Sequence, residues 1–316
     1  MALRSKKARR VAYQAAALAA LAAAAGFLIS NTAANLADRR IASGFGFLGR
    51  EAGFEIGESF FLRYDAGSTY LRALAVGVAN TLTVSAIGIV LASFLGTAVG
   101  LLSLARDSFL KGIGAAYVEF IRNVPLLVQL FFWYALITDA LPGTRQALEP
   151  LPHVFLTNRG IFLPSFSGVP ALQGFNFAGG IGISPEFAAL LAGLSLYAAA
   201  FIAEIVRAGI LAVPRGQYEA SSAMGMTYPA QMRFVIAPQA LRVIVPPLAS
   251  QYLNVVKNSS LAVAIGYPDL VSVANTTINQ TGQAIEGVAI IMAVYLTISL
   301  SISALMNWYN ARLGRR

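Results

Sequence analysis

Residues 217–238 read QYEASSAMGMTYPAQMRFVIAP and separate two long apolar stretches of the chain. The pattern predicts two short helices joined by a bend. Gly225 favours the end of the first helix, and Thr227 can cap a second helix that has Pro229 in its first turn. Several apolar side chains of the segment would be exposed without a partner, which is unusual for a plain solvated loop. These side chains are Ala220, Ala223, Met224, Met226 and Phe234. We therefore expect the segment to contact another protein.

The composition around this segment is that of a membrane protein. The chain has 316 residues, of which 57% are hydrophobic without counting Gly and 12% are charged. A soluble domain has roughly 45–50% apolar residues with Gly included, and about 25% charged residues. Disordered chains are poor in hydrophobic residues, so disorder is excluded as well. We expect an all-α, polytopic membrane protein.

Six stretches are long and apolar enough to cross a bilayer, which needs roughly 20 residues per helix. They are residues 11–29, 76–105, 117–141, 187–213, 239–265 and 284–308. The first lies in the basic segment 1–30, where a cleaved signal peptide is the alternative. Its long apolar part and poor cleavage site favour a retained anchor. In the second stretch, Gly96 and Gly100 have the spacing typical of close helix contacts in lipid.

The charge distribution predicts how the chain is oriented in the membrane. The net charge is +9, and basic residues gather in the N-terminal segment, in residues 214–238 and in the tail 311–316. Cytoplasmic loops of membrane proteins are rich in Lys and Arg, which explains this charge without nucleic acid. Six spans then place both termini in the cytoplasm of an inner-membrane protein. Segment 31–75 and the Pro- and Gly-rich loop 142–185 lie outside, the latter as an ordered connection with or without a re-entrant piece.

The sequence shows few features that are typical of an enzyme. The chain has no Cys, and its one His is His153. Residues 44–49 read GFGFLG and match the GxGxxG pattern, but no strand is predicted before them and no helix after them. The sequence also contains no Walker A motif. We therefore expect no catalytic site, no metal site and no cofactor bound by this chain.

Charged residues stand in pairs inside two of the predicted spans. Glu119 and Arg122 are three apart near the start of one span, and Glu204 and Arg207 repeat that spacing in another. Because charges in a membrane are costly, they are rarely incidental. Structural ion pairs and contact with a transported substrate are the two alternatives for both pairs.

Polar residues interrupt the predicted span 239–265 near its middle, after Pro246 and Pro247. They are Gln251, Asn254, Lys257, Asn258, Ser259 and Ser260. Transporters often place substrate at interrupted helices near the midplane. In that case Lys257 could meet a substrate carboxylate, while the amide and hydroxyl groups form hydrogen bonds. The alternative is hydrogen bonding between helices that holds two subunits together.

The segment 217–238 resembles the EAA loop of the membrane subunits of ABC importers. Glu219, Ala220, Gly225 and Pro238 stand at the positions of that motif, whereas Ser221 and Ala237 depart from it mildly. The resemblance covers residues 76–310. It implies a type I importer transmembrane domain with a five-helix core, here with one additional N-terminal span. It also implies that the loop forms coupling helices that sit in a cleft of an ATPase subunit.

A second stretch narrows the resemblance to one branch of these importers. Residues 117–132 read YVEFIRNVPLLVQLFF and resemble the third-span entry of the polar amino acid permeases of the histidine/glutamine type. Asn123 and Val124 depart from the usual Arg-Gly-Thr-Pro-Leu of that branch. The additional first span, residues 44–48 and the long loop 142–185 look like the Q-type subunits of general L-amino-acid permeases.

The resemblance also implies partners and an energy source. They are a homologous second permease subunit in a heterodimer (or homodimer), two ABC ATPase subunits that use the ATP, a periplasmic amino-acid-binding protein and the lipid bilayer. The main rival is a stand-alone secondary transporter or channel. It would be expected to show inverted repeats and acidic residues for ion coupling deep in the membrane. No clear repeat is present, and the intramembrane acids cluster at the cytoplasmic ends of their spans. A membrane enzyme or a purely structural subunit are weaker rivals.

Overall fold

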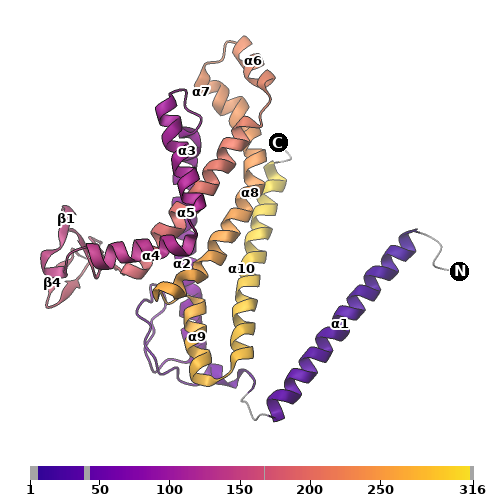
Figure 1. Ribbon diagram of the computed structural model, residues 1–316, viewed down its shortest axis with the longest axis vertical. Helices are drawn as coiled ribbons and strands as arrows, with labels where there is room; N and C mark the ends of the chain where they lie inside the picture. Colours follow the sequence, from indigo (N-terminus) through magenta and orange to yellow (C-terminus); the bar gives the residue numbers. More distant parts are fainter. Residues whose placement is uncertain (1–5, 39–42, 167, 314–316) are drawn as a thin grey trace.

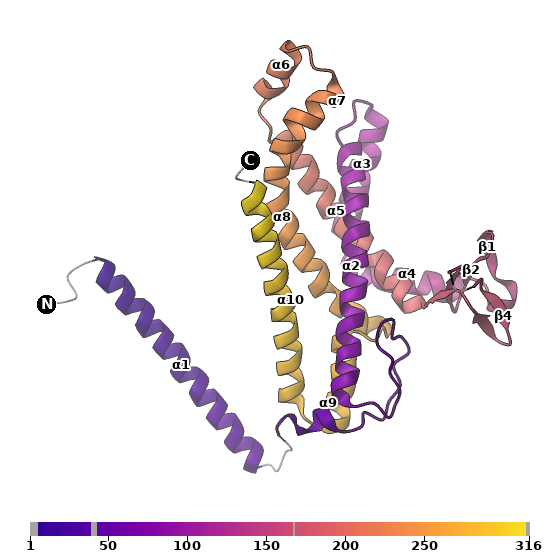
Figure 2. The same cartoon turned by 180° about the vertical axis from the view of Figure 1, so that it is seen from behind.

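The computed structural model describes residues 6–38, 43–166 and 168–313 as a mostly helical protein with a small sheet (Figures 1 and 2). The α-helices are α1 (Lys6–Asp38), α2 (Tyr70–Leu102), α3 (Ser108–Asn123), α4 (Leu126–Ala135), α5 (Pro185–Leu211), α6 (Arg215–Ala223), α7 (Tyr228–Gln231), α8 (Ala237–Asn258), α9 (Leu270–Thr281) and α10 (Ala284–Leu313). Three short 3-10 helices are η1 (Phe45–Gly49), η3 (Thr144–Gln146) and η5 (Ser259–Ile265), and two π-helical turns are η2 (Leu136–Ala140) and η4 (Met232–Ile236).

Five of these helical segments are long and apolar enough to cross a membrane, and the bent pair α3–α4 makes a sixth if it is counted as one span. The prediction of an all-α, polytopic protein is therefore confirmed for the helical bundle, to which the small sheet is an addition. The helices α2 and α5 begin and end a few residues before the predicted stretches, and α10 continues a few residues beyond its predicted end. Helix α1 stands apart from the bundle in both views, and its apolar stretch is not buried against the rest of the chain.

The stretch predicted as one span over residues 117–141 is instead broken into α3 and α4, which meet at about 100°. Val124 is extended (φ −92°, ψ 124°) because the residue before a proline disfavours the helical conformation. The side-chain amide of Gln129 donates hydrogen bonds to the carbonyls of Ile121 and Val124, both at 3.0 Å. Gln129 thereby satisfies carbonyl groups that the break would leave without a partner.

The central contact of the bundle is between α2 and α5, which run close together (Figure 2). A Cβ at Gly96 would lie 2.7 Å from the Ile202 Cβ and 2.8 Å from the Ala199 carbonyl oxygen. A Cβ at Gly100 would lie 2.7 Å from the carbonyl oxygen of Ala203. The close helix contact predicted for these glycines is therefore confirmed, and its partner is α5.

The polar residues expected to interrupt span 239–265 near its middle do not break the helix there. Helix α8 continues through Pro246 and Pro247 and changes to the 3-10 helix η5 only at Ser259. After it comes α9, a helix that the sequence did not predict, too short to cross a bilayer.

Helix α9 is held against α2 by polar contacts at its N-terminus. The buried carboxylate of Asp269 accepts from the backbone N–H of Ser272 at 2.8 Å, and Thr81 on α2 accepts from the N–H of Leu270 at 3.1 Å. The amide of Asn80 donates to the carbonyl of Pro268 at 2.9 Å. The bonds of Thr81 and Asn80 join residues nearly two hundred positions apart in sequence.

The Pro- and Gly-rich connection forms an antiparallel sheet that the sequence did not predict. Its strands are β1 (Leu148–Leu151), β2 (Val154–Thr157), β3 (Gly160–Leu163) and β6 (Ile181–Ile183), in the order β1-β2-β3-β6, and β4 (Ala171–Gln173) pairs with β5 (Asn176–Ala178). The Phe177 ring lies 4.4 Å from that of Phe155 and 5.1 Å from that of Phe162, which packs the β4–β5 hairpin against the larger sheet. The ordered loop is confirmed, but in its described residues it is made of strands.

The GxGxxG stretch anchors the segment before α2 to the start of α10. It forms the 3-10 helix η1, and Phe47 is buried beside Tyr70. The N–H of Gly44 donates to the Glu286 carboxylate, and the amide of Gln283 donates to the Gly44 carbonyl at 3.0 Å. After these glycines the described chain continues without an α-helix up to α2, so the helix that a dinucleotide site requires does not begin there.

The α6–α7 loop and α9 lie at opposite ends of the bundle, whereas the sheet projects to one side beyond α4. Helix α5 begins directly after β6 and ends directly before α6, so about 40 Å of helix separates the sheet from the α6–α7 loop. Helix α8 likewise runs from η4 to η5 and α9. Figures 1 and 2 show α6 and α7 at one end and α9 at the other.

We predict that Gly96→Ala destabilises the protein by ~1–3 kcal/mol, the usual cost of overpacking. The added methyl group would meet the Ala199 carbonyl, and a backbone atom cannot rotate away. The melting temperature of the detergent-solubilised protein measures the effect. The control is Gly112→Ala in α3, where a Cβ meets nothing within 4 Å. Because Ala favours a helix over Gly by about 1 kcal/mol, the control should melt no lower than wild type. Equal melting temperatures for the two variants would contradict the close contact.

Candidate functional site

The predicted bend at residues 217–238 is present at the end of the bundle in Figure 1. Helix α6 ends at Ala223, and Gly225 follows with φ 77°, a left-handed conformation that favours glycine. Thr227 occupies the N-cap position of α7, although its side chain forms no capping hydrogen bond, and Pro229 lies in the first turn. Pro238 stands in the first turn of α8.

Hydrogen bonds hold this loop together and tie it to the long helices. The side-chain amide of Gln231 donates to the Ser222 hydroxyl at 2.7 Å and joins α7 to α6. Gln239 donates to the side-chain carbonyl of Gln217 at 3.2 Å, and the Tyr218 hydroxyl donates to the Ile210 carbonyl at 3.3 Å. The loop is therefore linked directly to α5 and α8.

The loop exposes several large apolar side chains among its polar ones. Met224 is 82% exposed, Tyr228 64% and Phe234 65%. Ala220 and Ala223 are also exposed, as expected, whereas Met226 is half-buried. Glu219 is exposed on α6 as well. Tyr228 was not identified from the sequence. Its large aromatic side chain beside Pro229 could have been predicted to be exposed in the same way as that of Met224.

The two charge pairs behave differently. Arg207 forms a bidentate pair with Glu204 on α5, with nitrogen–oxygen distances of 2.6 and 2.9 Å. Among the described residues, Glu119 and Arg122 form no such pair. The Arg122 guanidinium instead lies 4.8 Å from the ring centre of Phe201, a cation–π contact between α3 and α5.

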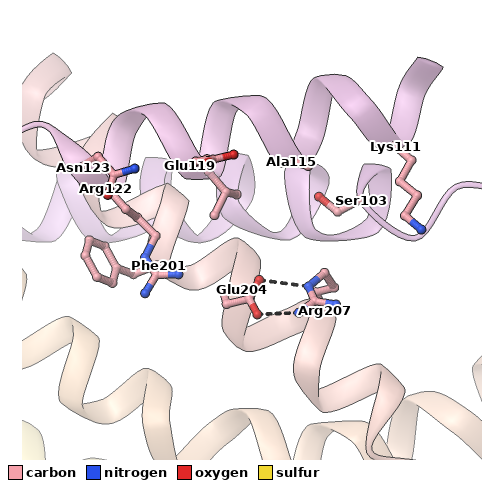
Figure 3. A pocket seen from close by; sticks show the side chains of 10 residues that line it. Ser103, Lys111, Ala115, Glu119, Arg122, Asn123, Phe201, Glu204 and Arg207 are labelled. Carbon is pink, nitrogen blue, oxygen red and sulfur yellow. Dashed lines mark hydrogen bonds and ion pairs between the residues drawn. The ribbon is translucent and has the colours of Figure 1, made fainter. Parts of the chain in front are cut away.

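Both pairs line one cavity between α3 and α5, shown in Figure 3. Its volume is about 650 Å³, and Lys111 and Ser103 line it as well. A second cavity of about 340 Å³ shares Arg122, Phe201 and Glu204 with the first and extends to Gln251 on α8. Lys111 and Phe201 were not identified from the sequence. Phe201 could have been found there, because it precedes Glu204 by three residues and so shares its helix face.

The polar residues at the end of α8 and the start of η5 divide into two groups. Asn254 and Lys257 are exposed on the helix, and Asn258 is half-buried. The hydroxyl of Ser259 donates to the Val256 carbonyl, and that of Ser260 to the Lys257 carbonyl, both at 2.7 Å. These two hydroxyls are engaged by their own helix, so the exposed group is the better candidate for contact with a substrate.

The acidic and histidine side chains do not gather in a way that suits a metal. In the described part of the chain, no three of them lie close enough to hold an ion. His153 stands in the turn between β1 and β2 with φ 63°, and its N–H donates to the Glu149 carboxylate at 2.8 Å. The residue is thus part of a surface turn.

The chain is similar over nearly its whole length to two bacterial permeases. It is 45% identical to the putative amino-acid ABC transporter permease protein YhdX of Escherichia coli (strain K12), with 96% of this chain and 93% of that protein covered. It is 39% identical to the general L-amino acid transport system permease protein AapQ of Rhizobium johnstonii, with 98% and 93% covered.

Solved structures share the fold. A crystal structure of an amino acid ABC transporter with histidines has a TM-score of 0.58 at 29% identity, covering 77% of this chain and 95% of that chain. An inward-facing structure of the MetNI methionine ABC transporter has a TM-score of 0.55 at 20% identity, covering 77% and 97%, and supports the fold alone.

The family described as binding-protein-dependent transport system inner membrane component matches residues 88–315. That range contains the α6–α7 loop, the charged cavity and the polar part of α8. The resemblance to ABC importer membrane subunits is thereby confirmed. The chain belongs to this family of inner membrane transport components, which are membrane-spanning permeases without an ATPase site of their own.

Proposed function

We propose that this chain is one permease subunit of an ATP-driven importer of L-amino acids. The names of its relatives YhdX and AapQ support the substrate class, as does the motif at residues 117–132. The observation that supports ATP as the energy source is the α6–α7 loop at one end of the bundle, which exposes the apolar side chains of Met224, Tyr228 and Phe234. A secondary transporter has no ATPase subunit to which these exposed side chains would bind.

The proposed orientation places the α6–α7 loop in the cytoplasm. The sheet, α9 and the segment before α2 then lie on the outer side, where a binding protein delivers its substrate. The basic ends of the chain lie on the cytoplasmic side, in line with the positive-inside rule. We infer that residues 76–310 form the permease domain. Residues 1–30 and 31–75 are additions before it, and residues 311–316 form a tail. Residues 314–316 of the tail lie outside the described residues.

Coupling to the ATPase runs through the loop in this proposal. Met224 and Tyr228 fill a cleft of the ATPase subunit, because burying large exposed apolar side chains stabilises an interface. Gly225 sets the angle between α6 and α7. When ATP binding closes the ATPase pair, the loop moves α5 and α8 through the hydrogen bonds of Tyr218 and Gln239. Glu219 and Gly225 transmit this movement and perform no chemistry.

The assembly proposed around this chain contains a second, homologous permease and two ATPase subunits that use the ATP. A heterodimer of permeases is the favoured arrangement, with a homodimer as the alternative. The exposed Asn254 and Lys257 on α8 would then face the pathway between the two permeases, together with the cavity at Arg122. Substrate passes between the two chains in this arrangement.

Uptake of a labelled amino acid tests the proposed function directly. Proteoliposomes that contain this chain, its partner permease and the ATPase should accumulate L-[³H]glutamine only when ATP and the binding protein are both supplied. Liposomes that contain this chain alone, with an imposed proton or sodium gradient, should accumulate none. Gradient-driven uptake by the chain alone would reject the ATP-driven importer.

Glu219→Gln and Gly225→Ala should uncouple ATP hydrolysis from uptake while the protein still inserts. A non-glycine residue in the left-handed conformation costs about 1–2 kcal/mol, which tilts α6 away from its docked position. We expect uptake to fall about tenfold, since 1.4 kcal/mol is a factor of ten. The measurement is the ratio of amino acid transported to ATP hydrolysed. Gly143→Ala, where φ is −63° and a Cβ meets nothing within 4 Å, is the matched control. Loss of membrane insertion in the loop variants would contradict the coupling role.

Lys257→Met should lower uptake without preventing assembly of the complex. Met keeps most of the length of the side chain but lacks the ammonium group that would meet a substrate carboxylate. Uptake rate and co-purification with the partner permease and ATPase separate the two alternatives. Loss of assembly would identify Lys257 as a subunit contact, and normal uptake would exclude the substrate role.

A further inference from the structure

Another cavity lies where the bundle meets the α6–α7 loop. It is bounded by the end of α2, the turn before α3, the end of α5 and the loop itself, and its volume is about 710 Å³. This volume falls in the range of roughly 300–1,000 Å³ that is typical of ligand pockets. Most of its lining side chains are apolar, among them Leu101, Leu104, Ile210 and Leu211.

An exposed apolar face of α2 leads into this cavity. Val90, Phe94 and Leu101 are exposed at intervals of four and seven residues, which places them on one side of the helix. Leu101 also lines the cavity. Between Val90 and Leu101 the helix rises about 16 Å, which is close to half of a hydrocarbon core of roughly 30 Å. The exposed face therefore has the length of one acyl chain in one leaflet of the membrane.

Arg106 is the one charged residue that lines the cavity in the described chain. Its side chain is exposed and forms neither an ion pair nor a hydrogen bond with another described residue. The neighbouring carboxylate of Asp107 is already engaged, because it caps α3 and accepts from the N–H groups of Phe109 and Leu110 at 2.9 and 3.0 Å. The guanidinium of Arg106 is thus available to an anion from outside the chain.

Two tyrosines, Tyr218 on α6 and Tyr228 on α7, line the cavity on the side of the loop. The hydroxyl of Tyr218 donates to the Ile210 carbonyl at 3.3 Å, whereas that of Tyr228 forms no hydrogen bond within the described chain. Tyrosine is enriched where membrane helices reach the lipid head groups, because its ring is apolar and its hydroxyl is polar. An apolar cavity with one free guanidinium and one free phenol is suited to a ligand with an apolar body and an anionic end.

We propose that this cavity binds a phospholipid with an anionic head group. The lipid phosphate pairs with Arg106 and accepts from the Tyr228 hydroxyl, and an acyl chain lies along the exposed face of α2. Basic pockets between membrane helices on the cytoplasmic side bind anionic head groups in other proteins. The lipid contacts α2 and the loop together and so stabilises the position of the loop. It leaves Met224 free for an ATPase, because Met224 does not line the cavity.

Lipid binding to the complex of this chain with its partner permease and ATPase tests the site. The complex is held in a neutral detergent and titrated with dioleoylphosphatidylglycerol or dioleoylphosphatidylcholine, and native mass spectrometry counts the bound lipid. The two lipids have the same chains, so a difference in affinity reports on the head group. Because other surfaces of the complex also bind lipid, the site is identified from the difference between wild type and each variant.

Arg106→Gln should lower the affinity for phosphatidylglycerol about fivefold, to that for phosphatidylcholine, as expected for one basic residue near an anionic head group. Arg106→Lys should restore the preference, because the positive charge returns. Ala105→Phe fills the cavity while Arg106 is kept, and it should weaken the binding of both lipids. The matched control is Lys111→Gln, which removes a positive charge from a side chain outside this cavity and should bind both lipids as wild type does.

Unchanged lipid binding by Arg106→Gln and Ala105→Phe would overturn the site. Glycerol 3-phosphate carries the phosphate without acyl chains, and an excess of it should leave phosphatidylglycerol bound. Displacement by glycerol 3-phosphate would show a plain anion site instead of a lipid site. If Ala105→Phe weakens binding of the ATPase and not of lipid, the cavity belongs to the interface with the ATPase and the proposal is wrong. The proposed function is tested separately, since ATP-driven uptake of glutamine by wild type does not depend on any of these outcomes.

Discussion

The close approach of α2 and α5 at Gly96 and Gly100 is the contact on which the rest of the structure depends. Two backbones can meet this closely only where no Cβ stands between them, and in lipid such packing replaces the hydrophobic effect as the force between helices. Helix α5 carries Glu204 and Phe201 into the cavity and then continues to the α6–α7 loop, while α2 holds α9 through Asn80 and Thr81. The two ends of the molecule are thus connected by one rigid helix pair.

A single proline determines where the charged residues of α3 lie. The break at Val124–Pro125 turns the chain by about 100°, so Arg122 stands at the last turn of α3 and contacts Phe201 on α5. Because Gln129 satisfies the carbonyl groups freed at the break, the bend is stable in an apolar surrounding. The geometry of the cavity is therefore a consequence of a backbone constraint rather than of side-chain packing alone.

The distribution of exposed groups explains why the chain works within an assembly. The loop presents Met224 and Tyr228 at one end, and α8 exposes Asn254 and Lys257 along its length. Large apolar side chains exposed on a loop and polar side chains exposed on a membrane helix are each in an unfavourable solvent when alone. An ATPase at the first surface and a second permease at the other would remove both costs, which agrees with a family of components that act together.

The sequence alone determined the membrane class, the positions of the apolar stretches, the bend at Gly225 and the helix contact at Gly96. These features depend on composition and on residues a few positions apart, which set helix periodicity, caps and turns. Only the tertiary structure decided that Arg207 pairs with Glu204 while Arg122 contacts Phe201, that Ser259 and Ser260 bond to their own helix, and that α9 and the sheet exist. Strand pairing and contacts between helices join residues far apart in the chain, and one sequence without its fold does not specify which partners meet. For the same reason the cavity between α3 and α5 could not be predicted, although four of the charged residues that line it were identified from the sequence.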